Sequence, residues 1–244
     1  MIIGGLEKLS ILDYPDHLAA IIFTQGCNFR CHFCYNPMLV LTREGEDEKN
    51  KKEKGLSPLS PEDLFLFLKQ RYGRLDGVVI TGGEPTLHPD LPSFIGKIKA
   101  IGYDVKLDSN GTNPEMLQEL ITEKLIDYIA MDIKAPLNKY ENTVSVPVVC
   151  DNLAKSVKII IASGLPHEFR TTVVPGLLNK EDFQIMGELI KGADKWYLQK
   201  FKSDTDLVDG TFKGKDAYTD KEMTEFAAIG RQAAGVCEVR NYKL

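Results

Sequence analysis

Short apolar runs alternate with amphipathic segments along most of this 244-residue chain. Six of these runs are typical of buried strands: residues 18–23, 77–80, 104–107, 128–131, 169–174 and 196–198. Stretches with helical periodicity separate most of them. Because alternating strands and helices fold as parallel strands joined by right-handed crossovers, the order predicts an α/β fold with a parallel sheet.

Capping residues mark the starts of several predicted helices. Ser60 stands before Pro61, and Asn179 precedes a stretch with apolar residues at helical spacing. Thr219 is followed three positions later by Glu222, which is the pattern of a capping box. Helices are therefore expected to begin near residues 61, 180 and 220.

Polar or flexible residues follow all six predicted strands. In parallel barrels the functional residues lie at the C-terminal ends of the strands, and eight βα units close a barrel of about 250 residues. Six units therefore predict an incomplete (β/α)6 TIM-like barrel rather than an open doubly wound sheet. Its site would lie across the strand ends, at residues 27–34, 81–85, 108–111, 132–134, 175–176 and 199–200.

The composition fits one domain. Hydrophobic residues make up 43% of the sequence, enough for one sizeable core. We predict a single domain over residues 1–244, with an N-terminal extension (1–17), a charged loop (43–55) and a C-terminal loop and helix (202–244). The charged loop is expected to be solvated, and two alternatives are a flap over the neighbouring cysteines or a partner contact.

Charge and hydropathy exclude some partners. The net charge of −5 argues against a nucleic-acid-binding surface, which is usually basic. No apolar run is long enough to cross a membrane, and the first residues do not resemble a signal peptide. We therefore expect a cytoplasmic protein that binds neither nucleic acid nor a membrane.

Three cysteines follow the first predicted strand: Cys27, Cys31 and Cys34, with the spacing C-x3-C-x2-C. A four-iron cluster needs four ligands, so three thiolates would leave one iron open to a substrate or cofactor. A zinc site completed by His32 or a distant histidine is the alternative. A disulfide is disfavoured, because the chain has five cysteines and a reducing compartment is expected. Cys150 and Cys237 are predicted to be buried free thiols.

These motifs resemble those of radical S-adenosylmethionine enzymes. The C-x3-C-x2-C loop, with Phe33 before its third cysteine, is similar to the signature of that superfamily, and Gly82-Gly83-Glu84-Pro85 resembles its second motif. The resemblance covers residues 18–201. Residues 107–111 and 131–134 are similar to stretches in activating enzymes of glycyl radical enzymes. The opening run 5–15 resembles activating proteins of anaerobic ribonucleoside-triphosphate reductase.

The resemblance implies a chemistry carried by cofactors. Cys27, Cys31 and Cys34 would hold a [4Fe–4S] cluster, and S-adenosylmethionine would bind its fourth iron. Reductive cleavage would give a 5′-deoxyadenosyl radical, which would abstract hydrogen from a glycine of a partner enzyme. A flavodoxin or ferredoxin-type protein would supply the electron. No protein acid or base is required, so no catalytic side chain is predicted.

The resemblance also implies which residues bind S-adenosylmethionine. Gly82 and Gly83 would let the backbone approach the methionine moiety, Glu84 would accept from its ammonium group, and Lys134 would bind its carboxylate. The remaining candidates are strand-end or aromatic residues: a monovalent cation site at Asp108, Ser109 and Asp132, adenine contacts at Phe33 and Val174, and Asn110. Ribose hydrogen bonding or turn capping is the alternative for the cation site. Arg170, Thr172 and Gln199 are expected to point into the barrel.

Two other functions stay open at this point. One is a radical S-adenosylmethionine enzyme that acts on a small molecule, such as 7-carboxy-7-deazaguanine synthase. The other, from a different class, is a zinc-stabilised binding module without catalysis.

Overall fold

The computed structural model describes residues 1–40 and 59–240, which form two compact units. The first unit comprises residues 1–28, 36–109 and 115–129, and the second comprises residues 29–35, 110–114 and 130–244. The predicted charged loop 43–55 lies outside the described residues. Each unit is described by itself below.

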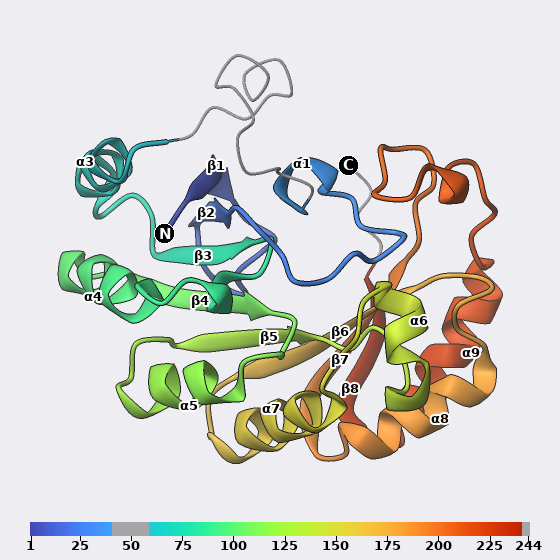
Figure 1. Ribbon diagram of the computed structural model, residues 1–244. Helices are drawn as coiled ribbons and strands as arrows, with labels where there is room; N and C mark the ends of the chain where they lie inside the picture. The colour runs from blue at the N-terminus through green and yellow to red at the C-terminus, as the bar shows by residue number, and fades with distance from the viewer. Residues whose placement is uncertain (41–58, 241–244) are drawn as a thin grey trace. The chain divides into compact units, whose positions relative to one another are not determined.

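The first unit is built on strands β1 to β4 and the start of β5 (Figure 1). Their bounds are β1 Ile3–Ser10, β2 Ala19–Thr24, β3 Gly77–Gly82, β4 Asp104–Ser109 and β5 Tyr128–Asp132. The helices are α1 Pro37–Val40, α3 Pro61–Arg71, the 3-10 turn η1 Pro85–Leu87, α4 Leu91–Ile101 and α5 Pro114–Thr122. Strand β1 pairs with β2 in the antiparallel direction, whereas β2, β3 and β4 are parallel.

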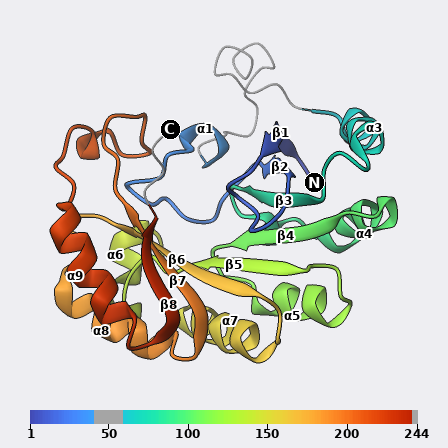
Figure 2. The same cartoon turned by 180° about the vertical axis from the view of Figure 1, so that it is seen from behind.

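The second unit contains the end of β5 and three further parallel strands, which lie side by side in Figure 2. These are β6 His167–Val173, β7 Ala193–Lys200 and β8 Ala234–Arg240. Its helices are η2 Leu137–Lys139, α6 Tyr140–Val144, α7 Cys150–Ala162, α8 Lys180–Leu189, η3 Gly210–Phe212 and α9 Asp220–Gly230. In Figure 2, α8 and α9 lie together on one side of β8.

The predicted α/β fold with parallel strands is confirmed. The six predicted strands correspond to β2 through β7, and the described strands follow one another in the sheet in chain order. Two strands were not predicted. Strand β1 lies within the predicted N-terminal extension 1–17, and β8 lies within the predicted C-terminal loop and helix 202–244. The single-domain organisation stays a prediction.

Each unit has its own apolar packing. In the first unit, a cluster of buried side chains joins the turn after β1 to β2, β3 and β5: Tyr14, Ala19, Ile21, Val79 and Tyr128. In the second unit, the ring of Phe183 on α8 stacks on Phe226 of α9 at 4.6 Å between centroids. Trp196 of β7 is fully buried, and its indole nitrogen donates to Thr171 Oγ1 over 2.9 Å. Burial of each large apolar side chain stabilises the fold by about 1.5–3 kcal/mol.

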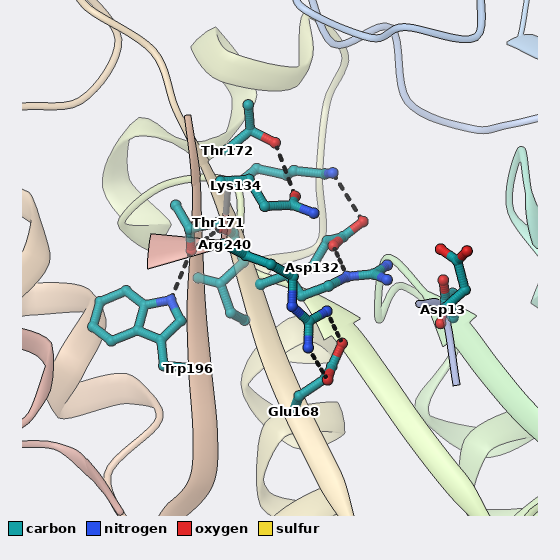
Figure 3. A network of polar contacts seen from close by, with 12 residues as sticks. Asp13, Asp132, Lys134, Glu168, Thr171, Thr172, Trp196 and Arg240 are labelled. Carbon is teal, nitrogen blue, oxygen red and sulfur yellow. Dashed lines mark hydrogen bonds and ion pairs between the residues drawn. The ribbon is translucent and has the colours of Figure 1, made fainter. Parts of the chain in front are cut away.

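The last strand is held by an ion pair, drawn in Figure 3. Arg240 of β8 donates from both terminal nitrogens to the Glu168 carboxylate of β6, at 3.1 and 3.0 Å. The Glu168 side chain is fully buried, and the Arg240 guanidinium also lies 3.6 Å from the centre of the Tyr197 ring on β7. A bidentate pair of this kind fixes β8 against its neighbours.

The predicted helix starts are observed. Ser60 accepts from Asp63 N at the start of α3, and Asn179 and Thr219 form capping boxes with Asp182 and Glu222. None of the helices within residues 1–40 and 59–240 has the length and apolar character that a membrane span requires.

Candidate functional site

The turn after β3 packs tightly against the backbone that leads to Cys27. Gly82 has a φ of +113°, and a Cβ there would lie 2.4 Å from Thr24 N. A Cβ on Gly83 would lie 1.9 Å from the carbonyl oxygen of Gly26. Gly83 N donates to Thr24 O at 2.9 Å, and Glu84 N donates to Gly26 O at 2.8 Å. Both glycines are thus required by the approach of the protein's own backbone.

Glu84 is a buried helix cap. Its side chain belongs to a residue that is 1% exposed, and Oε1 accepts from Thr86 N at 3.1 Å and from Thr86 Oγ1 at 2.5 Å. Ser109 Oγ at the end of β4 donates to the same oxygen over 2.9 Å. The structure therefore brings two predicted site residues, Glu84 and Ser109, into direct contact. The ammonium contact of Glu84 stays a prediction.

Asp108 forms an ion pair on β4. Its Oδ1 lies 2.9 Å from Nζ of Lys106, a lysine that is 1% exposed. Lys106 Nζ also donates to the carbonyl oxygen of Asp13 over 2.6 Å. Asp108 is thus compensated by a buried lysine that stands in none of the sequence motifs.

Asn110 shapes the turn that follows β4. Its Oδ1 accepts from Thr112 N at 3.0 Å and from Thr112 Oγ1 at 2.8 Å, which is the geometry of an Asx turn. Gly111 next to it has a φ of +78°, and a Cβ there would lie 2.0 Å from Met131 Cε. The contacts of Asn110 are those of a turn residue, and its predicted role in cofactor binding is not tested.

Asp132, Lys134 and Arg170 form a compact charged network in the second unit. Lys134 Nζ lies 3.0 Å from Asp132 Oδ2, and Arg170 Nε donates to Asp132 Oδ1 over 2.9 Å. Figure 3 shows the Lys134 ammonium directed toward the Asp132 carboxylate. The side chains of Asp132 and Lys134 are 23% and 16% exposed. At this degree of burial each charge depends on the others for compensation.

The pKa values of this network follow from that geometry. Burial raises the pKa of Asp132, but the Arg170 and Lys134 cations outweigh it and hold this pKa well below its ordinary range. For Lys134, burial lowers the pKa, while Asp132 and then Cys31 raise it, with a net result above the ordinary value. The network is therefore fully ionised at neutral pH, and Lys134 lies within electrostatic reach of Cys31.

Tyr140 supports this network and was not predicted. Its hydroxyl accepts from Lys134 N at 3.2 Å and donates to the carbonyl oxygen of Asp132 over 3.3 Å. Burial is the main cause of the raised pKa of Tyr140. The residue lies on the short helix α6 and shows no local pattern in the sequence that could have pointed to it.

The remaining candidate site residues, Phe33, Val174, Thr172 and Gln199, lie in the second unit. The Phe33 ring, on a residue 3% exposed, has the Lys134 ammonium 5.9 Å from its centre. Val174 is 1% exposed and lies just after β6, with its carbonyl accepting from Leu177 N at 3.2 Å. Thr172 Oγ1 donates to Gln199 Oε1 over 3.4 Å, as drawn for Thr172 in Figure 3. The adenine contacts of Phe33 and Val174 stay predictions.

The cysteine loop begins in the first unit with Cys27 and continues in the second with Cys31 and Cys34. Cys31 is buried, whereas Cys27 and Cys34 are half-buried, and none of these forms a disulfide. Cys34 N donates to Cys31 O at 3.1 Å, which closes a tight turn. Within residues 1–40 and 59–240, no three His, Cys, Asp or Glu side chains are grouped as ligands of a single metal ion. Three reduced thiols in one loop, with the Lys134 cation in electrostatic reach of Cys31, have the donor chemistry that an iron–sulfur cluster needs.

The comparison with known families decides the class of the chain. Residues 21–190 match the Radical SAM superfamily. The chain belongs to this superfamily. Its members use a [4Fe–4S] cluster and S-adenosylmethionine, and the chain is accordingly that of a radical S-adenosylmethionine enzyme. The alternative of a non-catalytic zinc module is thereby set aside.

Two curated relatives carry the names of activating enzymes. A protein of Methanocaldococcus jannaschii, provisionally described as a glycyl-radical enzyme activating enzyme, is 32% identical over 236 residues, which cover 95% of this chain and 92% of the relative. The pyruvate formate-lyase-activating enzyme of Streptococcus mutans is 26% identical over 202 residues, 78% of this chain and 72% of the relative.

Among solved structures, Streptococcus suis SuiB bound to S-adenosylmethionine has the same fold. The TM-score is 0.63 at 16% sequence identity, over 91% of this chain and 52% of the SuiB chain. At this identity the likeness concerns the fold alone.

Proposed function

We propose that this chain is an activating enzyme that installs a glycyl radical on a partner enzyme. The relative from Methanocaldococcus jannaschii carries this proposal, because the similarity extends over 95% of this chain and 92% of that one. When bound, the cluster and S-adenosylmethionine would supply the radical chemistry that removes a hydrogen atom from the glycine Cα.

The residues of the chain bind and orient these groups. Cys27, Cys31 and Cys34 are the residues that would hold the cluster. Lys134 is the proposed partner of the cofactor carboxylate, and Asp132 holds the lysine in its charged form at 3.0 Å. No acid or base of the protein has to move a proton, since the reaction transfers a hydrogen atom.

A monovalent cation beside the cofactor carboxylate is a further hypothesis, with Asp108, Ser109 and Asp132 as candidate ligands. Asp108 pairs with Lys106 at 2.9 Å, and Asp132 pairs with Lys134 and Arg170 at 3.0 and 2.9 Å. A cation would have to compete with these three positive side chains. Replacing potassium by sodium or choline in the assay buffer tests the hypothesis. If a monovalent cation binds at this site, the rate of 5′-deoxyadenosine formation should depend on which ion is present.

We propose anaerobic ribonucleoside-triphosphate reductase as the partner. Support comes from residues 5–15, which resemble the opening run of the proteins that activate this reductase. A flavodoxin or ferredoxin-type protein is the proposed electron donor. Reduced flavodoxin should then replace dithionite in supporting formation of 5′-deoxyadenosine.

Isotope transfer tests the proposed reaction. The partner enzyme is prepared with glycine deuterated at Cα and mixed anaerobically with reconstituted protein, reductant and S-adenosylmethionine. Mass spectrometry should then find one deuterium in 5′-deoxyadenosine. If the product carries no deuterium, the hydrogen does not come from glycine, and the alternative of a small-molecule substrate such as that of 7-carboxy-7-deazaguanine synthase is favoured.

A further inference from the structure

A C-terminal segment, residues 202–212, is hydrogen-bonded to the cysteine loop along its length. Val208 N donates to Cys34 O at 3.2 Å, and Asp209 N donates to His32 O at 3.1 Å. Lys202 N donates to the hydroxyl of Tyr35 at 2.8 Å. All these residues belong to the second unit, so the loop packs with a part of the chain that lies far along the sequence.

Side chains reinforce these backbone contacts at His32. Its Nδ1 lies 2.8 Å from Asp209 Oδ2, a contact between residues 177 positions apart. Since a carboxylate only accepts, Nδ1 is the donor. The other ring nitrogen, Nε2, lies 2.8 Å from Ser145 Oγ, within hydrogen-bonding distance. The ring also stacks on Phe212 at 5.2 Å and an interplanar angle of 9°.

The opposite side of the loop is held by α6. Arg30 N donates to Val144 O at 2.9 Å, and Ser145, which bonds to His32, is the C-cap residue of this helix. Residues 30–35 are therefore fixed between α6 and the 202–212 segment. Ser145, His32 and Asp209 have the connectivity of a hydrolytic triad. His32 and Asp209 are also joined by a backbone hydrogen bond, which indicates a structural task.

The two oxygens of Asp209 have separate tasks. Oδ1 accepts from Thr211 N at 2.9 Å and from Thr211 Oγ1 at 2.7 Å, and so caps η3. Oδ2 accepts from His32. The Asp209 carboxylate thus connects the fold of the 202–212 segment to the orientation of the His32 ring. In the sequence His32 lies between Cys31 and Cys34.

We propose that Asp209 is a positioning residue for the cluster: through His32 it fixes the loop so that Cys31 and Cys34 are oriented to hold iron. This inference rests on the proposed function, because it assigns the cluster to these cysteines. It adds a residue that lies outside both sequence motifs of the superfamily and that acts through His32.

A matched pair of variants tests the proposal. Asn has one oxygen where Asp has two, so Asp209→Asn can accept from Thr211 or from His32 Nδ1 but not from both. Because Asn is also a good capping residue, its oxygen can keep the cap of η3, and its amide NH2 group then faces His32 Nδ1. Asp206→Asn makes the same change on the same segment, at a residue whose side chain is 84% exposed and pairs with Lys213 at 3.1 Å. Only the first variant should affect the cysteine loop.

Two properties of the reconstituted protein are measured without substrate. Iron release to a chelator should be about tenfold faster for Asp209→Asn than for wild type, and unchanged for Asp206→Asn. The electron paramagnetic resonance spectrum of the reduced cluster should broaden in Asp209→Asn alone. Wild-type iron release and spectrum in Asp209→Asn would overturn the proposal.

Alkylation of the apo-protein separates this proposal from the proposed function. Mass spectrometry of the labelled peptides should find Cys31 and Cys34 modified faster in Asp209→Asn than in Asp206→Asn, with Cys237 unaffected in both. If wild type holds no cluster, the proposed function fails while this comparison still tests the orientation of the loop. Equal alkylation rates in the two variants would show that Asp209 does not fix the loop.

Discussion

The ammonium nitrogen of Lys134 lies 3.0 Å from Oδ2 of Asp132, directly after β5. Arg170 contacts the other carboxylate oxygen at 2.9 Å, so one acid is compensated by two cations. Lys134 is held in its charged form beside this strand end, and the carboxylate of S-adenosylmethionine is the anion that the proposed function would bring to it.

Removing the Lys134 charge should weaken cofactor binding. In Lys134→Met, the loss of one charged hydrogen bond is expected to raise the dissociation constant for S-adenosylmethionine about tenfold or more. The iron content should stay at the wild-type level. Equilibrium dialysis of the anaerobic protein measures the affinity, and a colorimetric iron assay measures the iron content. Lys180→Met is the control, since Lys180 is 60% exposed and pairs loosely with Glu225 at 3.6 Å. Equal affinity in wild type and Lys134→Met would remove this lysine from the cofactor site.

A side chain at Gly83 should distort the backbone next to Cys27. In Gly83→Ala, the new Cβ would lie 1.9 Å from Gly26 O, and rigid backbone must move. We expect a loss of about 2–4 kcal/mol in the free energy of unfolding, which lowers Tm by roughly 5–15 °C. Gly96→Ala is the control, because, among the described residues and apart from its chain neighbours and the backbone of α4 itself, no heavy atom would lie within 4 Å of a Cβ at this position. There alanine should stabilise by about 0.5–1 kcal/mol. Similar Tm values for both variants would contradict the close packing of the turn.

Glu84 separates a capping role from a cofactor role. In Glu84→Ala, the two Thr86 donors and Ser109 Oγ lose their common acceptor, at a cost of about 1–3 kcal/mol for each buried group left unpaired. Glu84→Gln keeps a carbonyl oxygen there and should retain most of the stability. Calorimetric titration of Glu84→Gln with S-adenosylmethionine then tests the predicted ammonium contact, which requires weaker binding. Unchanged affinity would leave Glu84 as a cap only.

The Cys237 thiol should react only when the fold opens. Burial is the main cause that raises its pKa from 9.0 to about 12. Because the folded value is the higher one, the neutral thiol contributes stability that is fully present below about pH 9 and is lost as the pH rises toward 12. Iodoacetamide at about pH 9 should therefore label native Cys237 far more slowly than the half-buried Cys150, and at a similar rate after denaturation. Equally fast labelling in the native protein would contradict the burial of Cys237.

Local patterns were enough to predict β2 to β7 and the helix starts. Ser60, Asn179 and Thr219 cap helices through residues three positions away, so the signal lies within one short window. Strand β1 was not predicted because Gly4, Gly5 and exposed charged residues interrupt the alternation of apolar and polar side chains along it. Strand β8 depends on the contact of Arg240 with Glu168, 72 positions away, which a local pattern does not carry.

The candidate site was predicted unevenly for the same reason. The cysteines, the glycine turn and Lys134 stand in short motifs that are visible in the sequence. The residues that contact the charged site residues are less visible. Lys106, the partner of Asp108, lies on the same strand. Arg170, the partner of Asp132, and Asp209, the partner of His32, lie 38 and 177 positions away. Such contacts exist only once the chain has folded.

The glycyl radical itself is the most direct test of the central claim. Reconstituted protein, S-adenosylmethionine, reduced flavodoxin and anaerobic ribonucleoside-triphosphate reductase are mixed without oxygen and examined by electron paramagnetic resonance. The account predicts a glycyl doublet on the reductase, absent when Cys34→Ala replaces the wild-type chain or when the radical-bearing glycine of the reductase is alanine. Formation of 5′-deoxyadenosine without a glycyl doublet on this reductase would contradict the proposed partner. If wild-type protein that carries the full cluster and S-adenosylmethionine forms no 5′-deoxyadenosine, the proposed chemistry is contradicted.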